Sequence, residues 1–317
     1  MIGPSPDHPG SAGSRSDRPL AILGPTASGK SALAMAIAAT VDGVELVSID
    51  SMQVYRGMDV GTATPTAAER AAIRHHLIDL VEPNETFAVG DFQQRARAAI
   101  ADIRGRGGIP VLVGGTGLYL RAVIDDLEIP DQYPDIRAEL EADADTAAQH
   151  RKLVSLDPVA ASRMEPNNRR RVIRALEVTL GSGRPFSSFG PGLETYPVTP
   201  FVQVALRWPR DELDRRIGLR YERQIDDGFL AEVEALRVIG PSPTASHALG
   251  YRELLGHLEG TCTLDEALEA AIRRTCRFAR RQERWFRRDP RIKWVDAPAD
   301  PEEVLAIWDE VRTTKEG

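Results

Sequence analysis

The 317-residue sequence predicts an α/β fold, a doubly wound parallel sheet that carries a mostly α-helical insertion domain. Three observations predict it. Short apolar runs alternate with helical segments, the runs end in glycine-rich loops or at an aspartate, and the alternation stops between residues 126 and 197. Alternating strands and helices are typical of right-handed βαβ units, and continuous apolar strands are typical of parallel sheets covered on both faces.

The elements of the predicted core follow one another in a regular order. Residues 20–23 form the first apolar run, which is expected to be a buried strand, and residues 31–39 form the helix after it. Further strands are expected at residues 44–49, 110–113, 201–208 and 292–295, and helices at residues 92–103, 211–239 and 264–287. The C-terminal third of the chain is therefore expected to complete the core.

The predicted domain boundaries follow this change in pattern. Residues 1–18 are mostly Pro, Gly, Ser, Asp and Arg, and they are predicted to be a disordered N-terminal tail because they lack apolar side chains to offset the entropy of ordering. The core domain is expected over residues 19–125 and 198–317. Residues 126–197 are polar, rich in Ala and Arg, and broken by prolines, so they are expected to form a helical insertion hinged near residues 129–130 and 181–200.

Composition excludes several classes of protein. With 42% hydrophobic and 27% charged residues, the chain is not collagenous, of low complexity or wholly disordered. Its longest nearly unbroken apolar run, residues 32–41, is shorter than the ~18 residues that span a bilayer, so we expect a cytoplasmic protein without a membrane partner. Cys262 and Cys276 have no partners at zinc-ligand spacing, and no self-association stripe is visible, so we expect no zinc site and a monomer.

Two arginine clusters stand against the acidic average of the chain. The formal net charge of −7 disfavours a nucleic-acid partner, but residues 273–288 hold eight arginines against a single acid, Glu283, which gives a local charge of +7. A second cluster contains Arg169, Arg170, Arg171 and Arg174. The sequence thus predicts a cationic groove on an acidic body.

The most specific short motif is a phosphate-binding loop directly after the first strand. Residues 24–31 read GPTASGKS and fit G-x-x-x-x-G-K-[S/T] between a strand and a helix, as that motif requires. Backbone N–H groups and the helix N-terminus bind phosphate, Lys30 neutralises its charge, and Ser31 can ligate Mg²⁺. A P-loop NTPase-like fold with a di- or triphosphate ligand is therefore predicted. The motif leaves open phosphoryl transfer from a nucleotide and departure of a diphosphate leaving group.

Two further segments lie where strands of the predicted sheet end. Asp50 ends the second strand, and residues 114–117, Gly-Gly-Thr-Gly, follow the third. Ligands of open α/β sheets bind beyond these ends, so we interpret Asp50 and Thr116 as ligand-facing and the glycines as allowing a close approach of backbone to ligand. A capping role for Asp50 and a plain loop at residues 114–117 are the alternatives.

Together the motifs resemble the tRNA dimethylallyltransferases, a family that transfers a prenyl group from dimethylallyl diphosphate to N6 of the adenosine beside the tRNA anticodon. The matching segments are GPTASGKS (24–31), SIDSMQVYRGMDVGTA (48–63), HHLIDLVEP (75–83), VLVGGTGLYL (111–120), DPVAASRMEPNNRRRVIRALEV (157–178), LGYREL (249–254) and RRQERWFRR (280–288). The chain departs from the family at Thr64, where a Lys is usual. A diphosphate contact from that position is therefore in doubt.

The resemblance implies a donor site and a catalytic group. The donor diphosphate, rather than ATP, would be bound by Gly24, Pro25, Thr26, Ala27, Ser28, Gly29, Lys30 and Ser31, with Mg²⁺ as cofactor and Ser31 as its ligand. Asp50, Thr26 and Arg220 would be catalytic, Asp50 as the base and anchor for adenine N6 and Arg220 as a second diphosphate contact. An aspartate at this position can instead organise Mg²⁺, and Arg220 could be a solvated helix charge.

The resemblance also implies a tRNA anticodon stem-loop as partner, from which the target base leaves its stack. The implied contacts are Asp50, Ser51, Met52, Gln53, Thr116, Arg170, Arg171, Arg174, Gly250, Tyr251, Arg252, Arg280, Arg281, Gln282, Arg284 and Trp285. At helical spacing Arg280 and Arg284 would share a face with Arg273, Arg277 and Arg288, with Gln282 and Trp285 in it. The insertion is expected to close on the RNA from the opposite side.

Two other functions remain open from the residues alone. A P-loop small-molecule kinase is favoured by the phosphate loop, and a non-catalytic RNA-binding switch by the loop together with the arginines. We interpret His75 and His76 as structural, because adjacent strand residues face opposite ways. Met52, Met58 and Trp208 are interpreted as packing residues in preference to a prenyl pocket.

Overall fold

The computed structural model describes residues 18–310, so the predicted N-terminal tail lies outside the described residues except for Arg18. One parallel six-stranded sheet has the order β3-β2-β4-β1-β5-β6. Its strands are β1 (Leu20–Leu23), β2 (Val44–Ile49), β3 (His75–His76), β4 (Ile109–Gly114), β5 (Val202–Arg207) and β6 (Ile292–Asp296). The predicted α/β class and all five predicted core strands are confirmed, and β3 adds a short edge.

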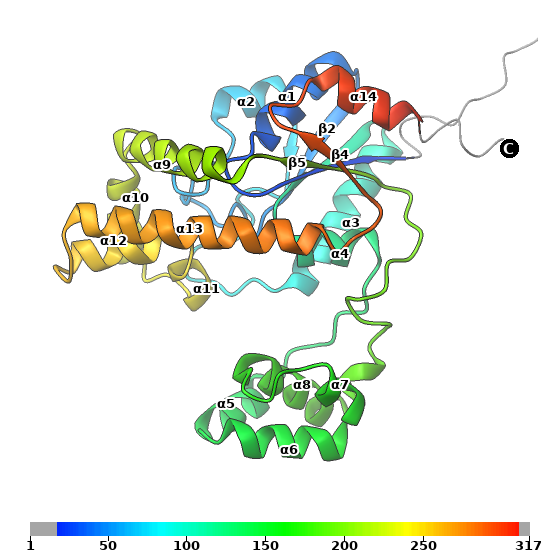
Figure 1. Ribbon diagram of the computed structural model, residues 1–317, viewed down its shortest axis with the longest axis vertical. Coiled ribbons are helices and arrows are strands. Elements are labelled where there is room, and N and C mark those ends of the chain that lie inside the picture. The colour runs from blue at the N-terminus through cyan, green and yellow to red at the C-terminus, as the bar shows by residue number, and fades with distance from the viewer. Residues whose placement is uncertain (1–17, 311–317) are drawn as a thin grey trace, which may run out of the picture.

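Helices cover both faces of this sheet (Figure 1). Along β1, Leu20 and Ile22 contribute to one apolar cluster and Ala21 and Leu23 to the other, which explains why the strand is apolar throughout. The first cluster includes α1 (Lys30–Thr40) and α14 (Pro301–Glu310), and the second includes α3 (Val89–Gly105), α4 (Gly117–Ile124) and α13 (Leu264–Phe286). None of the described helices combines the length and apolar composition needed to cross a bilayer.

A group of helices extends beyond the carboxyl ends of the strands (Figure 1). It contains α9 (Arg210–Asp226), α10 (Phe229–Ile239), α11 (Pro243–Ser246) and α12 (Tyr251–Leu258). Helices α9 and α12 pack with α13, and α10 packs with α9 and α12, while α2 (Ala67–Ala72) lies after β2. The single helix predicted over residues 211–239 is wrong, because Gly228 adopts φ 96° and separates α9 from α10. Glycine reaches this left-handed conformation at little steric cost.

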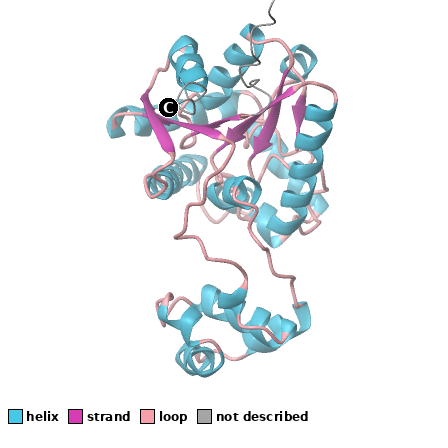
Figure 2. Cartoon of the chain, turned by 90° about the vertical axis from the view of Figure 1, so that its right-hand side faces the viewer, coloured by secondary structure: helices cyan, strands magenta, loops and turns pink. Residues whose placement is uncertain are grey.

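The segment between α4 and β5 is helical, as predicted, and stands apart from the sheet (Figures 1 and 2). It consists of α5 (Pro134–Ala142), α6 (Thr146–Leu156), α7 (Pro158–Ser162), α8 (Arg169–Ser182) and a 3₁₀ turn at Phe186–Ser188. Leu153, Val172 and Leu176 are buried in a cluster of its own. We therefore retain residues 126–197 as our proposed insertion domain and residues 19–125 with 198–317 as the proposed core.

Candidate active site

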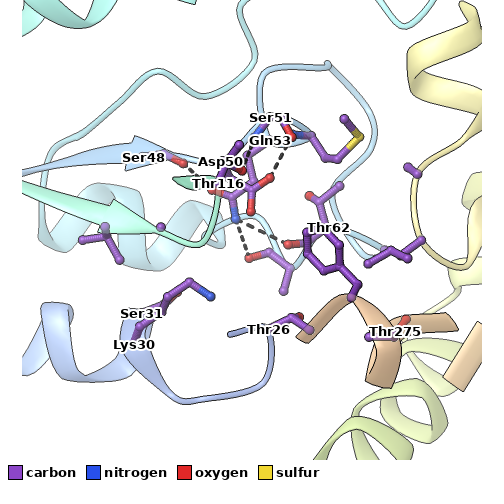
Figure 3. A pocket seen from close by; sticks show the side chains of 18 of the residues that line it. Thr26, Lys30, Ser31, Ser48, Asp50, Ser51, Gln53, Thr62, Thr116 and Thr275 are labelled. Atoms are coloured by element: carbon purple, nitrogen blue, oxygen red, sulfur yellow. Dashed lines mark hydrogen bonds between the residues drawn. The ribbon is translucent and has the colours of Figure 1, made fainter. Parts of the chain in front are cut away.

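A cavity of about 390 Å³ lies at the carboxyl ends of β1, β2 and β4 (Figure 3). Thr26, Asp50 and Thr116, which follow these three strands, line it together with Arg220 of α9 and Gln282 of α13. The sheet topology explains the meeting of the three strand-end residues, because β2, β4 and β1 are adjacent and parallel. Residues predicted as a site from separate motifs therefore share one cavity.

The phosphate loop is fixed by side chains from three other elements. Gln282 Oε1 accepts the Thr26 backbone N–H at 2.9 Å, and Arg216 Nε donates to the Ala27 carbonyl at 2.9 Å. Trp208 Nε1 donates to the Ser28 carbonyl at 2.9 Å. Trp208 thus anchors the loop and is not part of the cavity wall, and the role of Arg216 was not foreseen from the sequence.

The backbone of the phosphate loop needs residues that tolerate close packing and left-handed geometry. A Cβ on Gly24 would lie 2.7 Å from Ser28 Oγ, and Gly29 has φ 89°. Ala27 adopts φ 62°, which costs a non-glycine residue about 1 kcal/mol. The three anchoring side chains offset this cost and hold the loop curled without a ligand.

Two partly buried cations line the cavity without a carboxylate partner among the described residues. Arg220 donates to two neutral oxygens, Thr26 Oγ1 at 2.8 Å and the Gly61 carbonyl at 3.1 Å. Lys30 Nζ reaches only the Pro25 carbonyl, at 3.4 Å. Removal from water lowers the pKa of Lys30 to about 8, and it also lowers the pKa of Arg220. Such underpaired cations favour an anionic ligand.

Asp50 presents a carboxylate to the same cavity. Its Oδ1 accepts the Met52 N–H at 2.8 Å, which fixes the side chain beside the end of β2. Asp50 is among the groups that act on the pKa of Lys30, and its charge opposes the lowering. The carboxylate is therefore held near both cations, where it can serve as a base or as part of a metal site.

Gln53 does not have the free amide that the sequence predicted for hydrogen bonding to RNA. Its Oε1 accepts from Ser48 Oγ at 2.7 Å, and its Nε2 donates to the Ala63 carbonyl at 3.1 Å. Gln53 therefore ties the loop after residue 58 to β2. Gln53, Ser51 and Met52 all line the cavity, and the Ser51 N–H donates to Thr116 Oγ1 at 3.3 Å.

Gly115 and Gly117 pack closely against α13, whereas Gly114 lines the cavity, and the close approach of these glycines to a ligand stays a prediction. A Cβ on Gly115 would overlap the amide of Gln282, and one on Gly117 would overlap the indole of Trp285. Gln282 Nε2 also donates to the Gly115 carbonyl at 2.9 Å. Gln282 and Trp285 thus point towards the core and contact the protein's own loops.

The arginine face predicted for α13 includes two residues, Gln282 and Arg280, that the structure shows in contact with other parts of the protein. Gln282 is 8% exposed and occupies the buried side of the helix, and Arg280 forms an ion pair with Asp214 of α9 at 2.8 Å. Three exposed arginines of α13, Arg277, Arg281 and Arg284, have no ion pair within residues 18–310, and neither does Arg288, two residues after its end. The spacing of four and three residues places Arg277, Arg281 and Arg284 on one face of the helix.

Two of the residues implied as RNA contacts in the segment LGYREL are packed inside. Tyr251 is 1% exposed and donates its hydroxyl proton to Glu232 Oε1 at 2.5 Å. A Cβ on Gly250 would lie 2.8 Å from the ring of Phe229. Both residues are therefore packed within the protein, although Tyr251 also lines the cavity, and Arg252 is exposed; the implied RNA contacts of all three stay predictions.

The insertion arginines also divide into two kinds. Arg174 donates to the Pro130 carbonyl at 2.7 Å and pairs with Glu177 at 2.8 Å, so its guanidinium holds the segment that leads into the insertion. Arg174 is thus engaged within the protein, and its implied RNA contact stays a prediction. Arg170 and Arg171 are exposed on α8 and remain available.

Glu232 clamps the loop at residues 59–61 through hydrogen bonds, which the sequence did not predict. Glu232 of α10 accepts the N–H groups of three successive residues, Asp59, Val60 and Gly61, at 2.7, 2.7 and 3.0 Å. Gly61 in turn accepts from Arg220. In the sequence, the only hint of this contact is the glycine at position 61. In the structure, a Cβ at this position would overlap Phe229 and Tyr251.

The two histidines have structural contacts. His76 Nε2 lies 2.6 Å from Glu45 Oε2, and His75 Nδ1 lies 2.7 Å from the Ile73 carbonyl. Burial lowers the pKa of His75. Within residues 18–310, no group of three His, Cys, Asp or Glu side chains has the arrangement of a metal site.

The oxygen donors of the cavity are compatible with Mg²⁺. Ser31 and Asp50 line it, and they supply a hydroxyl and a carboxylate oxygen beside the phosphate loop. Mg²⁺ prefers oxygen ligands and is commonly held by one or two protein groups together with substrate phosphates and water. A dedicated cluster of carboxylates is therefore unnecessary for a metal that arrives with a diphosphate.

Comparisons with known proteins agree on one family. The family model described as IPP transferase matches residues 53–289. The chain is 49% identical to the tRNA dimethylallyltransferase of Kineococcus radiotolerans, over 89% of this chain and 92% of the relative. It is 48% identical to that of Thermobifida fusca, over 91% and 93%.

Two solved structures extend the similarity to three dimensions. The tRNA isopentenylpyrophosphate transferase of Bacillus halodurans has a TM-score of 0.68 at 39% identity, covering 93% of this chain and 95% of that one. A eukaryotic dimethylallyltransferase acting on tRNA has a TM-score of 0.74 at 26% identity, covering 94% and 76%.

Proposed function

The chain belongs to the IPP transferase family, and from this premise we propose that it transfers a dimethylallyl group from dimethylallyl diphosphate to tRNA, releasing diphosphate. The proposed acceptor is N6 of the adenosine 3′-adjacent to the anticodon. Prenyl transfer to tRNA is the activity that the names of the relatives carry. The reaction would take place in the cytoplasm, with the enzyme as a monomer.

The observation that carries the donor assignment is the pair of cavity cations without carboxylate partners. Lys30 and Arg220 approach the phosphate loop from α1 and α9, and Arg220 also contacts Thr26 Oγ1. A diphosphate placed between them would exchange neutral contacts for charge-assisted ones. The negative charge that develops on the departing group is where preorganised donors contribute most to catalysis.

The proposed chemistry uses Asp50 on the acceptor side. The amine nitrogen forms a bond to the allylic carbon as the bond from that carbon to the diphosphate oxygen breaks. The Asp50 carboxylate accepts the N6 proton, while Thr26, Lys30 and Arg220 hold the leaving diphosphate. The carboxylate is fixed through its Oδ1 contact with Met52, so its position is set before the acceptor arrives.

Mg²⁺ is the proposed cofactor, held by Ser31 and the donor diphosphate. When bound, it would neutralise charge on the diphosphate and make it a better leaving group. Asp50 could contribute to this site instead of acting as the base. The two roles differ in whether loss of Asp50 weakens the Mg²⁺-dependent binding of diphosphate.

The test incubates the enzyme with unmodified tRNA, dimethylallyl diphosphate and Mg²⁺ and measures the mass of the tRNA. We expect one added C5H8 unit on a single adenosine. The Asp50→Ala enzyme should lose ~10²–10⁴ of its single-turnover rate, the usual contribution of a general base, while diphosphate affinity stays within a few-fold. A retained rate would overturn the base role, and a large loss of Mg²⁺-dependent affinity would favour the metal role.

The same experiment separates the alternatives. A P-loop small-molecule kinase would turn over a nucleoside triphosphate without tRNA, and an RNA-binding switch would change RNA affinity with nucleotide but form no covalent product. The phosphate loop alone favours the kinase. The relatives named as tRNA dimethylallyltransferases favour prenyl transfer.

A further inference from the structure

Gln282 is buried and hydrogen-bonded within the protein, so contact with a ligand at the surface does not explain its position. It lies on the buried side of α13, is 8% exposed, and uses both ends of its amide within the protein. Its oxygen accepts from the Thr26 backbone, and its nitrogen donates to the Gly115 carbonyl, both at 2.9 Å. A single side chain therefore joins the loop after β1 to the loop after β4.

These two loops carry opposite halves of the proposed reaction. On the donor side, Thr26 Oγ1 accepts from Arg220 at 2.8 Å. On the acceptor side, Thr116 follows Gly115, and its Oγ1 accepts the N–H of Ser51, the residue after Asp50, at 3.3 Å. The chain of contacts from Arg220 through Gln282 to Asp50 is continuous, with one bridging residue at its centre.

The helix that carries Gln282 also carries exposed positive charge. Arg277, Arg281 and Arg284 project from the other side of α13, Arg288 follows just after its end, and none of the four has an ion pair within residues 18–310. Arg281 lines the cavity as well. An RNA backbone bound along this row would contact the same 23-residue helix whose inner side holds both loops.

The inner contacts of α13 leave little freedom at this point. A Cβ on Gly115 would overlap the Gln282 amide and lie 3.1 Å from the Gly24 carbonyl, so the two loops and the helix meet in close packing. One turn further along, Trp285 packs on Gly117 in the same way. A small displacement of α13 therefore cannot be absorbed without changing the loop positions.

We propose that Gln282 is a positioning residue that couples RNA binding on the exposed row of α13 to the geometry of the diphosphate site. This proposal rests on the proposed function for the identity of its two ligands. RNA bound to α13 would fix the position of this helix, and through Gln282 it would fix the positions of the Thr26 and Gly115 loops relative to each other. Diphosphate affinity and the rate of the chemical step then depend on RNA through the Gln282 amide. Linkage requires the reciprocal effect of diphosphate on RNA affinity.

The test measures binding of inorganic diphosphate with Mg²⁺ to the whole enzyme, without and with a saturating anticodon stem-loop RNA. In the unmodified enzyme the RNA should tighten diphosphate binding by ~5- to 100-fold, the usual range of such coupling. In Gln282→Met, a side chain of similar volume without hydrogen bonds, the ratio should fall to about one, within the ~2-fold scatter of such measurements. RNA affinity without diphosphate should stay close to that of the unmodified enzyme.

Two further variants separate positioning from loss of folding. Gln282→Glu keeps an acceptor for Thr26 but removes the donor to Gly115, so an intermediate coupling ratio is expected even if the Met variant is poorly folded. Arg284→Gln is the matched control on the exposed side of α13. It should weaken RNA binding yet retain the full coupling ratio once RNA is saturating.

Each result decides the proposal. Absence of coupling in the unmodified enzyme, or wild-type coupling in both Gln282 variants, overturns it. Loss of coupling in Arg284→Gln at saturating RNA would also overturn it, because the effect would then follow surface charge. The proposed function fails separately, by absence of prenylated tRNA with the unmodified enzyme, and that outcome leaves the binding ratios measurable.

Discussion

Arginine side chains occur in two different environments, one partly buried at the cavity and one exposed to solvent on the insertion helix α8. Arg220 is partly buried, is oriented by Thr26 and Gly61, and has no carboxylate partner in the described chain. Arg170 and Arg171 are exposed on α8. The attraction of Arg220 for an anion is strengthened by its removal from water and its fixed geometry. The attraction of Arg170 and Arg171 for an anion is screened by water and salt. The difference indicates that arginine acts on bond breaking at the cavity and on capture of RNA at the insertion.

The largest effect is expected from Arg220→Gln. This change removes a charge that is preorganised for the leaving diphosphate, so the single-turnover rate should fall by ~10²–10³, as on removal of one oxyanion donor. Arg220→Lys keeps the charge but loses the paired donors to Thr26 and Gly61, and we expect a loss of intermediate size. If both variants were as active as the unmodified enzyme, Arg220 would have no special role in bond breaking compared with the exposed arginines of α8.

The next effect concerns the clamp that positions Arg220. Glu232→Gln replaces one carboxylate oxygen by an amide donor, which faces backbone N–H groups of residues 59–61. The free energy of unfolding should fall by ~1.5–3 kcal/mol, the usual contribution of hydrogen bonds to a charged group. The value of kcat/KM for the donor should fall with it, because Gly61 accepts from Arg220.

The control for this variant lies on the same helix. Glu234 is exposed and pairs only with Arg237 at 3.1 Å, so Glu234→Gln should change the unfolding free energy by no more than about 0.5 kcal/mol. Chemical denaturation and steady-state kinetics of the two variants are sufficient. A Glu232 variant that behaves like the Glu234 variant would show that the clamp contributes neither stability nor position.

Lys30 allows the desolvation argument to be tested through stability. Burial lowers its pKa from 10.5 to about 8, so between these values the unfolded chain binds more protons than the folded one. Stability attributable to this group therefore rises as pH increases through that window, and the full penalty applies below pH 8. Lys30→Met should raise the free energy of unfolding by ~1–3 kcal/mol at pH 7 and remove this pH dependence.

The ligand provides the internal check for Lys30. Inorganic diphosphate should stabilise the unmodified enzyme against denaturation and should stabilise Lys30→Met much less, because the variant lacks the cation that the anion neutralises. A destabilised Lys30→Met protein at pH 7 would contradict the desolvation argument. It would mean that the attraction between Lys30 and Asp50 outweighs burial.

The sequence predicted most of what depends on local pattern. Strand ends, the phosphate loop and Asp50 follow from apolar runs and motifs, whereas Arg220 follows from the family resemblance, and the structure brings these side chains into one cavity. The errors concern which side of a helix faces inward. Helical spacing suggested Gln282 as an RNA contact and the family resemblance suggested Tyr251, and their partners within the protein, Thr26 and Glu232, lie 256 and 19 residues away in sequence and give no local signal. Glu232 itself has no local signal, since its three acceptor contacts exist only after folding.

The smallest effect is expected at the insertion. Replacement of both Arg170 and Arg171 by Gln should weaken binding of an anticodon stem-loop and reduce the slope of log affinity against log salt by ~1.4–1.8, about 0.7–0.9 for each lost phosphate contact. Diphosphate affinity should not change, because neither side chain lines the cavity. Arg237→Gln, on α10 and outside both arginine clusters, is the control and should leave the slope as it is. A double variant with an unchanged slope would mean that α8 does not touch RNA, and capture would then depend on the exposed arginines of α13 alone.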